Sequence, residues 1–161
     1  MREILFRGKD PETGTWYEGF YMALSDTTYC FKGDYDAHPD NTKHYIVFDR
    51  MTDWGLPNQH LRADVDPTTV GQYTGLNDKN GKRIFEGDIL GSRYDNLYPD
   101  DVAIEVVKWF RNGWYIQQEN NLPDALCEYG VLPYSDVIGN IHDNPELLKG
   151  GAELGYTKIR G

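Results

Sequence analysis

Acidic side chains with strand spacing occur at Glu86 and Asp88, inside the strand-like segment Ile84–Leu90. Residues two apart on a strand face the same side, so the two carboxylates can act together as an acid/base pair. Gly87 between them equally favours a tight bend, in which both carboxylates accept hydrogen bonds from nearby backbone N–H groups. We predict the structural role, with the acid/base pair as the alternative.

A second polar segment contains His142 and Asp143, which can pair as a base and the group that orients it. Asn140, Asn144 and Pro145 surround them and are typical of a turn before a short helix. We therefore predict that His142 holds a strand-to-helix corner. The alternative is a small hydrolase or nucleotide-modifying enzyme that uses His142 with Asp143, or Glu86 with Asp88.

An acidic loop offers candidate metal ligands at every second position: Asp34, Asp36, His38 and Asp40. Such spacing is typical of calcium loops. However, Pro39 stands where that loop needs glycine, and Tyr45 stands where it needs a bidentate glutamate. We predict solvated charges here and no metal site.

Other reactive motifs are missing from the sequence. It has no His-Glu-x-x-His, no Gly-x-Ser-x-Gly and no phosphate-binding Gly-x-x-x-x-Gly-Lys. We predict no cofactor, while Cys30 or Ser135 with a distant histidine stays possible as a nucleophile. Cys30 and Cys127 form no Cys-x-x-Cys pair, and we expect both to be small buried residues in a reducing cytoplasm.

The net negative charge of the chain limits which partners it can bind. The 161 residues carry 16 Lys plus Arg against 26 Asp plus Glu, a formal charge of -10. This opposes non-specific nucleic-acid binding, which depends on cations displacing counterions. A local patch at Lys79, Lys82 and Arg83 is expected to solvate a turn. No apolar run approaches the ~20 residues of a membrane helix, and no signal-peptide core is present, so we expect a cytoplasmic protein.

Aromatic residues and turn formers dominate the composition, with 12 Tyr, six Phe, four Trp, 17 Gly and eight Pro. This composition favours short strands between turns. We predict strands near 3–7, 16–23, 27–32, 44–49, 69–74, 83–94, 102–110, 113–118 and 135–141. Short helices are expected at 145–149 and 122–129, a loop at 33–43, and a crossing between lobes at 55–67.

Three turns are predicted from their residues: Lys9–Thr15, Asn77–Lys82 and Arg111–Gly113. The last two contain Asn-Gly, a strong hairpin signal. The third turn would place Trp109 and Trp114 opposite each other across two strands.

Four motifs in order resemble the YopX-like proteins of bacteriophages and prophages. The central one is VGQYTGLNDKNGKRIFEGDIL (70–90), and the C-terminal one is VIGNIHDNPELL (137–148). The opening REILFRGK (2–9), followed by WYEG (16–19), and the pair Val107-Lys108-Trp109 and Gly113-Trp114 also fit. The resemblance implies a small β-rich phage or prophage protein without established activity, and it supplies no catalytic residues.

The sequence therefore predicts a mainly β protein: a partly open small β-barrel with an N-terminal β lobe and one or two short helices. We expect one YopX-like domain over 1–149, with lobes of about 1–65 and 66–149, and a loosely held tail at 150–161.

The leading functional prediction is a non-enzymatic, self-associating interaction module, because rigid aromatic side chains are favoured at interfaces. It would be a homo-oligomer that can also bind a host or phage protein. Besides the enzyme, a second alternative is an acidic DNA mimic that inhibits a host DNA-binding protein. The mimic would present a row of carboxylates from Asp34, Asp36, Asp40, Asp95, Asp100 and Asp101.

Overall fold

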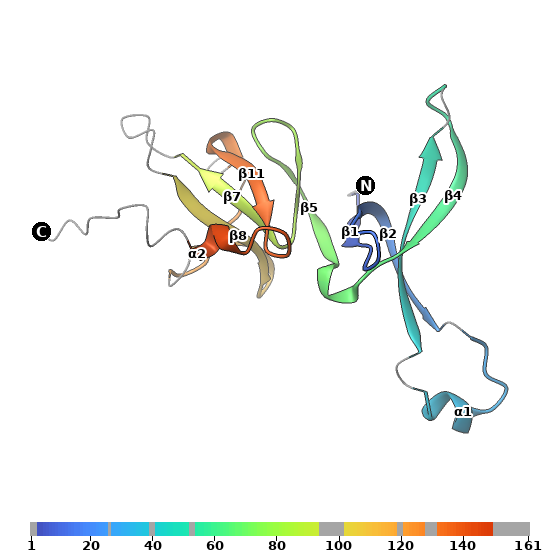
Figure 1. Ribbon diagram of the computed structural model, residues 1–161. Helices are drawn as coiled ribbons and strands as arrows, with labels where there is room; N and C mark the ends of the chain where they lie inside the picture. The colour runs from blue at the N-terminus through green and yellow to red at the C-terminus, as the bar shows by residue number, and fades with distance from the viewer. Residues whose placement is uncertain are drawn as a thin grey trace, which may run out of the picture. The chain divides into compact units, whose positions relative to one another are not determined.

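The computed structural model describes residues 3–25, 27–38, 41–51, 54–93, 102–118, 121–127 and 132–149. The chain divides into two compact units, Met1–Gln72 and Tyr73–Gly161. Antiparallel strands form most of both units (Figure 1). Each unit also has buried apolar side chains of its own, Ile46 in the first and Val107 in the second.

The first unit contains four antiparallel strands in the order β4-β3-β2-β1. Their bounds are β1 Phe6–Lys9, β2 Trp16–Ser25, β3 Thr42–Met51 and β4 Pro57–Asp64. Helix α1 (Lys32–Asp36) lies in the connection from β2 to β3. A 3-10 turn, η1 (Pro67–Thr69), then leads to β5 (Gly71–Asn77), whose first residues pair with β1.

The β1–β2 turn forms as its residues predict. Asp10 Oδ1 accepts hydrogen bonds from the backbone N–H groups of Glu12 (2.8 Å) and Thr13 (2.9 Å). The bond from Thr13, with that from Glu12, lowers the pKa of Asp10 below its ordinary value. Gly14 completes the turn with a φ of 70°, a conformation that costs glycine nothing.

The sheet of the first unit has two unlike faces. Opposite residues of antiparallel strands share a face, so Tyr21, Ile46 and Ala63 lie together on one side. Ile46 is fully buried and Ala63 is 9% exposed, and the other face carries Phe20, which is 65% exposed. One face therefore carries the buried Ile46 and Ala63, and the other carries the exposed Phe20 together with the buried Tyr45.

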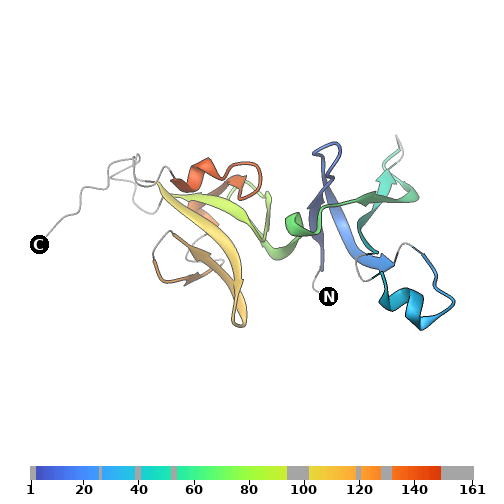
Figure 2. The same ribbon diagram turned by 60° about the horizontal axis from the view of Figure 1, so that its bottom comes forward.

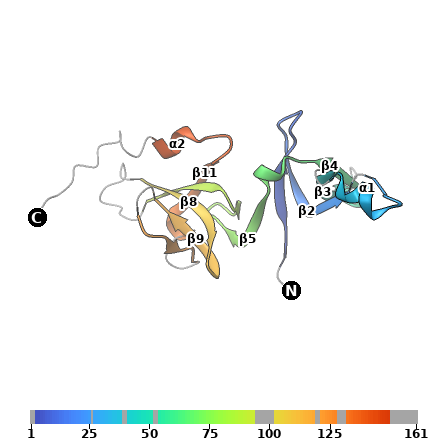
Figure 3. The same cartoon turned by 90° about the horizontal axis from the view of Figure 1, so that it is seen from below.

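The second unit contains a five-stranded antiparallel sheet in the order β10-β9-β8-β7-β11. Its strands are β7 Asp88–Ser92, β8 Ala103–Phe110, β9 Gly113–Gln117, β10 Asp124–Ala125 and β11 Ser135–Asn140. From Tyr73 onward, β5 pairs with β6 (Arg83–Phe85). A 3-10 turn, η2 (Leu132–Tyr134), precedes β11, and helix α2 (Glu146–Lys149) follows it. Figures 2 and 3 show the closed end of the β8–β9 hairpin extending beyond the neighbouring strands of this unit.

The core of the second unit contains an aliphatic cluster, and Phe85 is buried as well, at 1% exposed. The cluster consists of Ile84, Leu90, Val107, Ile116, Leu126 and Leu132. Trp109 and Trp114 are paired across β8 and β9, as predicted, with ring centroids 4.9 Å apart and planes at 77°. This edge-to-face geometry adds roughly 0.5–1.5 kcal/mol to the burial of the rings.

The predicted fold class is confirmed: the protein is mainly β, with a partly open barrel and short helices. Within the described residues, the edge strands β10 and β11 do not pair with each other, so the sheet does not close. The β5–β6 turn instead reaches β11, where Lys79 N–H donates to the Ser135 carbonyl at 3.3 Å. The lobe boundary was predicted near residue 65, whereas the two units divide after Gln72. The tail predicted at 150–161 lies outside the described residues.

Several local predictions are wrong. Residues 27–32 are not a strand, and the loop predicted at 33–43 includes most of α1. The predicted crossing at 55–67 contains the eight-residue strand β4, whose polar residues carry little strand propensity and pair because β3 offers a free edge. The part of the helix predicted at 122–129 that the structure describes, 122–127, contains no helix but the short strand β10, which pairs with β9.

Two further differences concern Gly87 and the two cysteines. The strand predicted at 83–94 is broken at Gly87, which takes a φ of 81°. Cys30 and Cys127 are exposed rather than buried. Within the described residues, no helix has the length and apolar character needed to cross a membrane.

Candidate functional site

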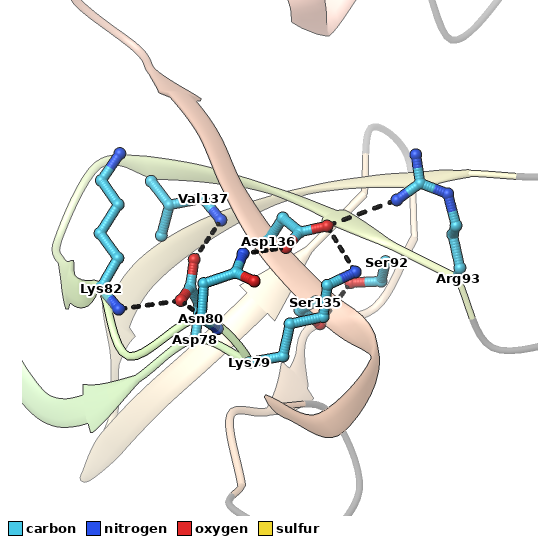
Figure 4. A network of polar contacts seen from close by, with 9 residues as sticks. All are labelled: Asp78, Lys79, Asn80, Lys82, Ser92, Arg93, Ser135, Asp136 and Val137. Carbon is cyan, nitrogen blue, oxygen red and sulfur yellow. Dashed lines mark hydrogen bonds and ion pairs between the residues drawn. The ribbon is translucent and has the colours of Figure 1, made fainter.

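The densest polar network of the second unit is centred on Asp78, at the start of the β5–β6 turn (Figure 4). Its side chain is 7% exposed. Oδ1 accepts hydrogen bonds from the backbone N–H of Asn80 (2.8 Å) and of Lys82 (2.9 Å), while Oδ2 accepts one from Val137 N–H on β11 (3.0 Å). One carboxylate therefore shapes the turn and also attaches it to β11.

Asp136 forms a second centre beside it. Its carboxylate lies 2.6 Å from Lys79 Nζ and 3.4 Å from Arg93 Nη1, and Asn80 Nδ2 donates to it at 2.6 Å. The hydrogen bond from Lys79 is the largest of the effects that lower the pKa of Asp136. Asp136 is therefore held in its charged form, which makes it a poor general base near neutral pH.

Two buried hydroxyls lie nearby, on β7 and β11. Ser92 Oγ donates to Glu105 Oε2 at 2.7 Å and lies 2.7 Å from Ser135 Oγ. Both serines have no exposed surface, and Glu105 is 5% exposed. Sequence analysis named Ser135 as a possible nucleophile, but a nucleophile must reach its substrate. In this position the hydroxyls serve to satisfy a buried carboxylate.

Glu86 and Asp88 do not share a strand. Glu86 lies in the turn before β7, and Asp88 is the first residue of β7. Asp88 is 1% exposed, and its Oδ2 accepts a hydrogen bond from Phe85 N–H at 2.7 Å. This contact matches the structural role predicted for Asp88.

His142 and Asp143 lie exposed in the turn that follows β11. Asn140 organises this turn: its Oδ1 accepts from the backbone N–H of His142 (3.0 Å) and Asp143 (2.9 Å). Asn140 Nδ2 donates to Asp143 Oδ2 at 3.0 Å. Asn140 therefore organises this strand-to-helix corner.

The candidate metal ligands lie at and after helix α1. Asp36 pairs with Lys32 Nζ at 2.7 Å, and His38 Nδ1 bonds to the Asp34 carbonyl oxygen at 2.8 Å. Asp40 lies outside the described residues. Among the residues that the structure does describe, no group of three or more His, Cys, Asp or Glu side chains is placed to hold a metal ion.

Two cavities lie in the described part of the first unit. One, of about 480 Å³, is lined by residues that include His44 and Asp64; the other, of about 510 Å³, is lined by residues that include Tyr29 and Cys30. His44 is already bonded to the Tyr21 hydroxyl through Nδ1. Neither cavity is lined by the candidates of the second unit, Glu86, Asp88, His142 and Asp143.

The outward face of the first unit carries a row of apolar side chains. Phe20, Met22 and Leu24 alternate along β2, and Val47 lies opposite Phe20 on β3. Phe20 is 65% exposed and Leu24 is 48% exposed, while Met22 and Val47 are half-buried. We call these four residues the outer apolar face.

A family model described as YopX protein matches residues 5–149. The chain belongs to the YopX family. No curated protein matches it.

A solved structure resembles this YopX-family chain: the crystal structure of protein EF1440 from Enterococcus faecalis. The two are 24% identical, with a TM-score of 0.54. The match covers 92% of this chain and 99% of EF1440. At this identity the likeness concerns the fold alone.

Sequence analysis of this YopX-family chain did not single out Asp78 or Asp136. The local part of the Asp78 network has a signal, because aspartate at the start of a turn bonds to backbone N–H groups two to four residues later. The bond to Val137, 59 residues away, has no such signal. The pairing of Asp136 with Lys79 likewise depends on how β11 meets the β5–β6 turn.

Proposed function

We propose that this YopX-family chain is a non-enzymatic interaction module that associates with further copies of itself through the outer apolar face. The observation that carries the proposal is the exposure of Phe20 and Leu24, at 65% and 48%, on one face of a regular sheet. Large apolar side chains that are clustered rather than scattered typically mark interaction sites.

The alternation along β2 supports this choice of surface. Strand residues that face solvent are ordinarily polar, so Phe20, Met22 and Leu24 at successive outward positions break the usual pattern. The opposite face of the sheet carries the buried Ile46 and Ala63, while Tyr45 on the same face as Met22 is covered by Arg62. The outer apolar face is therefore not part of that core, and a partner can cover it.

The charges around the outer apolar face fit a second copy. Lys43 and Arg62 share this face with Asp64, as the strand register requires. Arg62 lies over the ring of Tyr45, with Cζ 4.7 Å from its centroid. A two-fold axis brings one such face against another, so a face with both signs of charge can pair cations of one copy with the anions of the other.

Support for a non-enzymatic role comes from the carboxylates. Asp78 and Asp136 have protein donors at both oxygens, as described above. The serine pair beside Glu105 is buried. These groups stabilise the fold and leave no exposed nucleophile beside a base in that network.

The family resemblance adds a setting to the proposal. We place the module in the cytoplasm of a cell that carries a bacteriophage or prophage, where a phage or host protein can be a further partner. The alternative of an acidic DNA mimic receives no support from the described residues, because Asp40, Asp95, Asp100 and Asp101 lie outside them.

Sedimentation velocity across the micromolar range tests the self-association. The wild-type chain is expected to form a dimer or larger assembly, and the double variant Phe20→Ser, Leu24→Ser is expected to sediment as a monomer, because each change removes apolar area from the interface. Trp54→Ala is the matched control, since Trp54 is 89% exposed outside this face. A wild-type chain that stays monomeric, or a double variant that still assembles, contradicts the proposal.

A further inference from the structure

The closed end of the β8–β9 hairpin, Lys108–Tyr115, carries aromatic rings on both of its faces; we call it the hairpin tip. Phe110 and Tyr115 meet edge to face at 5.7 Å on one side, and Trp109 and Trp114 pair on the other. Trp109 is 50% exposed and Phe110 is 42% exposed. The tip thus presents paired aromatic rings to solvent.

The charge of the hairpin tip opposes that of the whole chain. Lys108 and Arg111 are its cations, and no Asp or Glu occurs from Val106 to Gln118, although the chain carries -10. The strand register places Lys108, Phe110 and Tyr115 on the same face. Among the described residues, Lys108 Nζ contacts only the neutral Gln117 Oε1, at 3.4 Å, so its charge is not neutralised there.

Arg111 occupies a costly backbone position at the corner of this hairpin. Its φ is 57°, which makes it the one residue other than glycine with positive φ in the described chain. The left-handed conformation is unfavourable for an L-residue with a side chain, and glycine would occupy it freely. Its guanidinium Cζ lies 5.1 Å from the centroid of the Phe110 ring. The corner therefore places a cation directly beside the exposed aromatic face.

We propose that the hairpin tip binds a short segment of single-stranded nucleic acid. Every base has a flat π-face that stacks on an aromatic ring, and each phosphate carries a negative charge that Lys108 or Arg111 can neutralise. In this arrangement bases stack on Phe110 and Tyr115 while the two cations contact phosphates. A duplex keeps its bases stacked inside and offers the platform no π-face.

This inference goes beyond the proposed self-association and does not rest on it. The residues involved lie in the second unit, whereas the outer apolar face lies in the first. The net charge of -10 still opposes a nucleic-acid coat over the whole surface. Binding is confined to the tip, is short in reach, and is weakened by the repulsion of the remaining chain.

Fluorescence anisotropy with end-labelled oligo-dT and oligo-U of about ten nucleotides tests the proposal, since comparable platforms cover roughly 4–16 nucleotides. Both single strands are expected to bind in low salt, and a DNA duplex of equal length is not. If Lys108 and Arg111 each neutralise one phosphate, a plot of the logarithm of the binding constant against the logarithm of the salt concentration should have a slope of about -1.4 for single strands.

Three variants separate stacking from charge. Phe110→Ala is expected to weaken binding at least about fivefold, because a base loses its stacking partner. Lys108→Ala with Arg111→Ala is expected to bring the salt slope close to zero. Trp54→Ala and Lys32→Ala are the matched controls, since both side chains are exposed in the first unit, and they should leave affinity and slope unchanged. Near-ultraviolet circular dichroism checks that each variant is folded.

Four results would overturn the proposal: no binding of either single strand, equal binding of the duplex, an unchanged salt slope in the double variant, or an equal loss in Trp54→Ala. Loss of self-association in Phe110→Ala, without an effect on oligonucleotides, would instead assign the hairpin tip to contact between copies.

Discussion

The Asp78 side chain joins the β5–β6 turn to β11 in the second unit. It accepts backbone N–H groups from its own turn and from β11, and it is 7% exposed. A carboxylate that satisfies several buried donors contributes more than an exposed ion pair, because each donor would otherwise lose its partner without gaining water.

Replacement of Asp78 by alanine is expected to destabilise the protein by about 2–4 kcal/mol, since three backbone donors lose their acceptor. Asp78→Asn does not rescue it, because an amide that keeps Oδ1 toward the turn presents an NH₂ group to Val137 N–H. Urea unfolding measures both. Asp36→Asn, which loses only an exposed pair with Lys32, serves as the control and should change stability by less than about 1 kcal/mol.

Asp136 makes stability depend on pH. Its pKa is lowered, first by the hydrogen bond from Lys79, so the folded protein holds fewer protons at this site than the unfolded chain. The stabilisation is complete above the unfolded pKa of about 3.9 and is lost as pH falls through the lowered value. Exposure of the pair limits the effect to about 1 kcal/mol or less.

Asp136→Asn and Lys79→Met are expected to flatten the acid side of the stability profile, because each removes the interaction that lowers this pKa. Urea midpoints measured from pH 6 down to pH 2 check this. A wild-type profile no steeper than that of the variants would show that Asp136 is not linked to folding.

Strands β2 and β3 illustrate what decides structure at the level of elements. They approach closely at Gly19, where an added Cβ would lie 2.1 Å from the Val47 carbonyl oxygen. Such an overlap with backbone cannot be relieved by turning a side chain. Gly19 therefore lets β2 pair with β3. On the other edge of β2, Phe6 of β1 lies opposite Gly19.

Gly19→Ala is expected to cost more than about 2 kcal/mol, because the strands must separate or bend to admit the methyl group. Gly33→Ala is the matched control: an added Cβ meets no atom within 4 Å, and alanine favours helix α1. Thermal unfolding compares them. Equal midpoints for the two variants would contradict the close packing of β2 against β3.

At the level of the whole molecule, the chain comprises two units with separate buried side chains. Ile46 is buried in the first, and Val107 belongs to the aliphatic cluster of the second. Regions with separate cores can open separately, and each opening has its own free energy.

Val107→Ala is therefore expected to destabilise the second unit by about 2 kcal/mol and to lower amide protection in β7, β8 and β9 roughly thirtyfold. Amides of β2 and β3 should keep their protection. Native-state hydrogen exchange measures this, with Ile46→Val as the converse variant. Uniform loss across both units would mean that they unfold as one.

Much of this architecture was predictable from local sequence. Alternating aromatic and apolar residues, divided by turns such as Asp10–Gly14 and Asn80-Gly81, led to a mainly β protein with a partly open barrel. The pairing of Trp109 with Trp114 followed from the position of one turn between them. Such signals are reliable because they concern residues within a few positions of one another.

Tertiary structure alone decided the features that depend on distant partners. The polar segment Pro57–Asp64 forms a strand because β3 supplies its hydrogen bonds. The residues at 27–32, which have strand-like types, do not form a strand. The sequence by itself determined the fold class, the turns and the family. Only the tertiary structure brought Asp78 to Val137 and Asp136 to Lys79, since these contacts join segments that are far apart in the sequence and that no local propensity brings together. It also decided that Phe20 stays exposed, because burial depends on which elements pack against a strand.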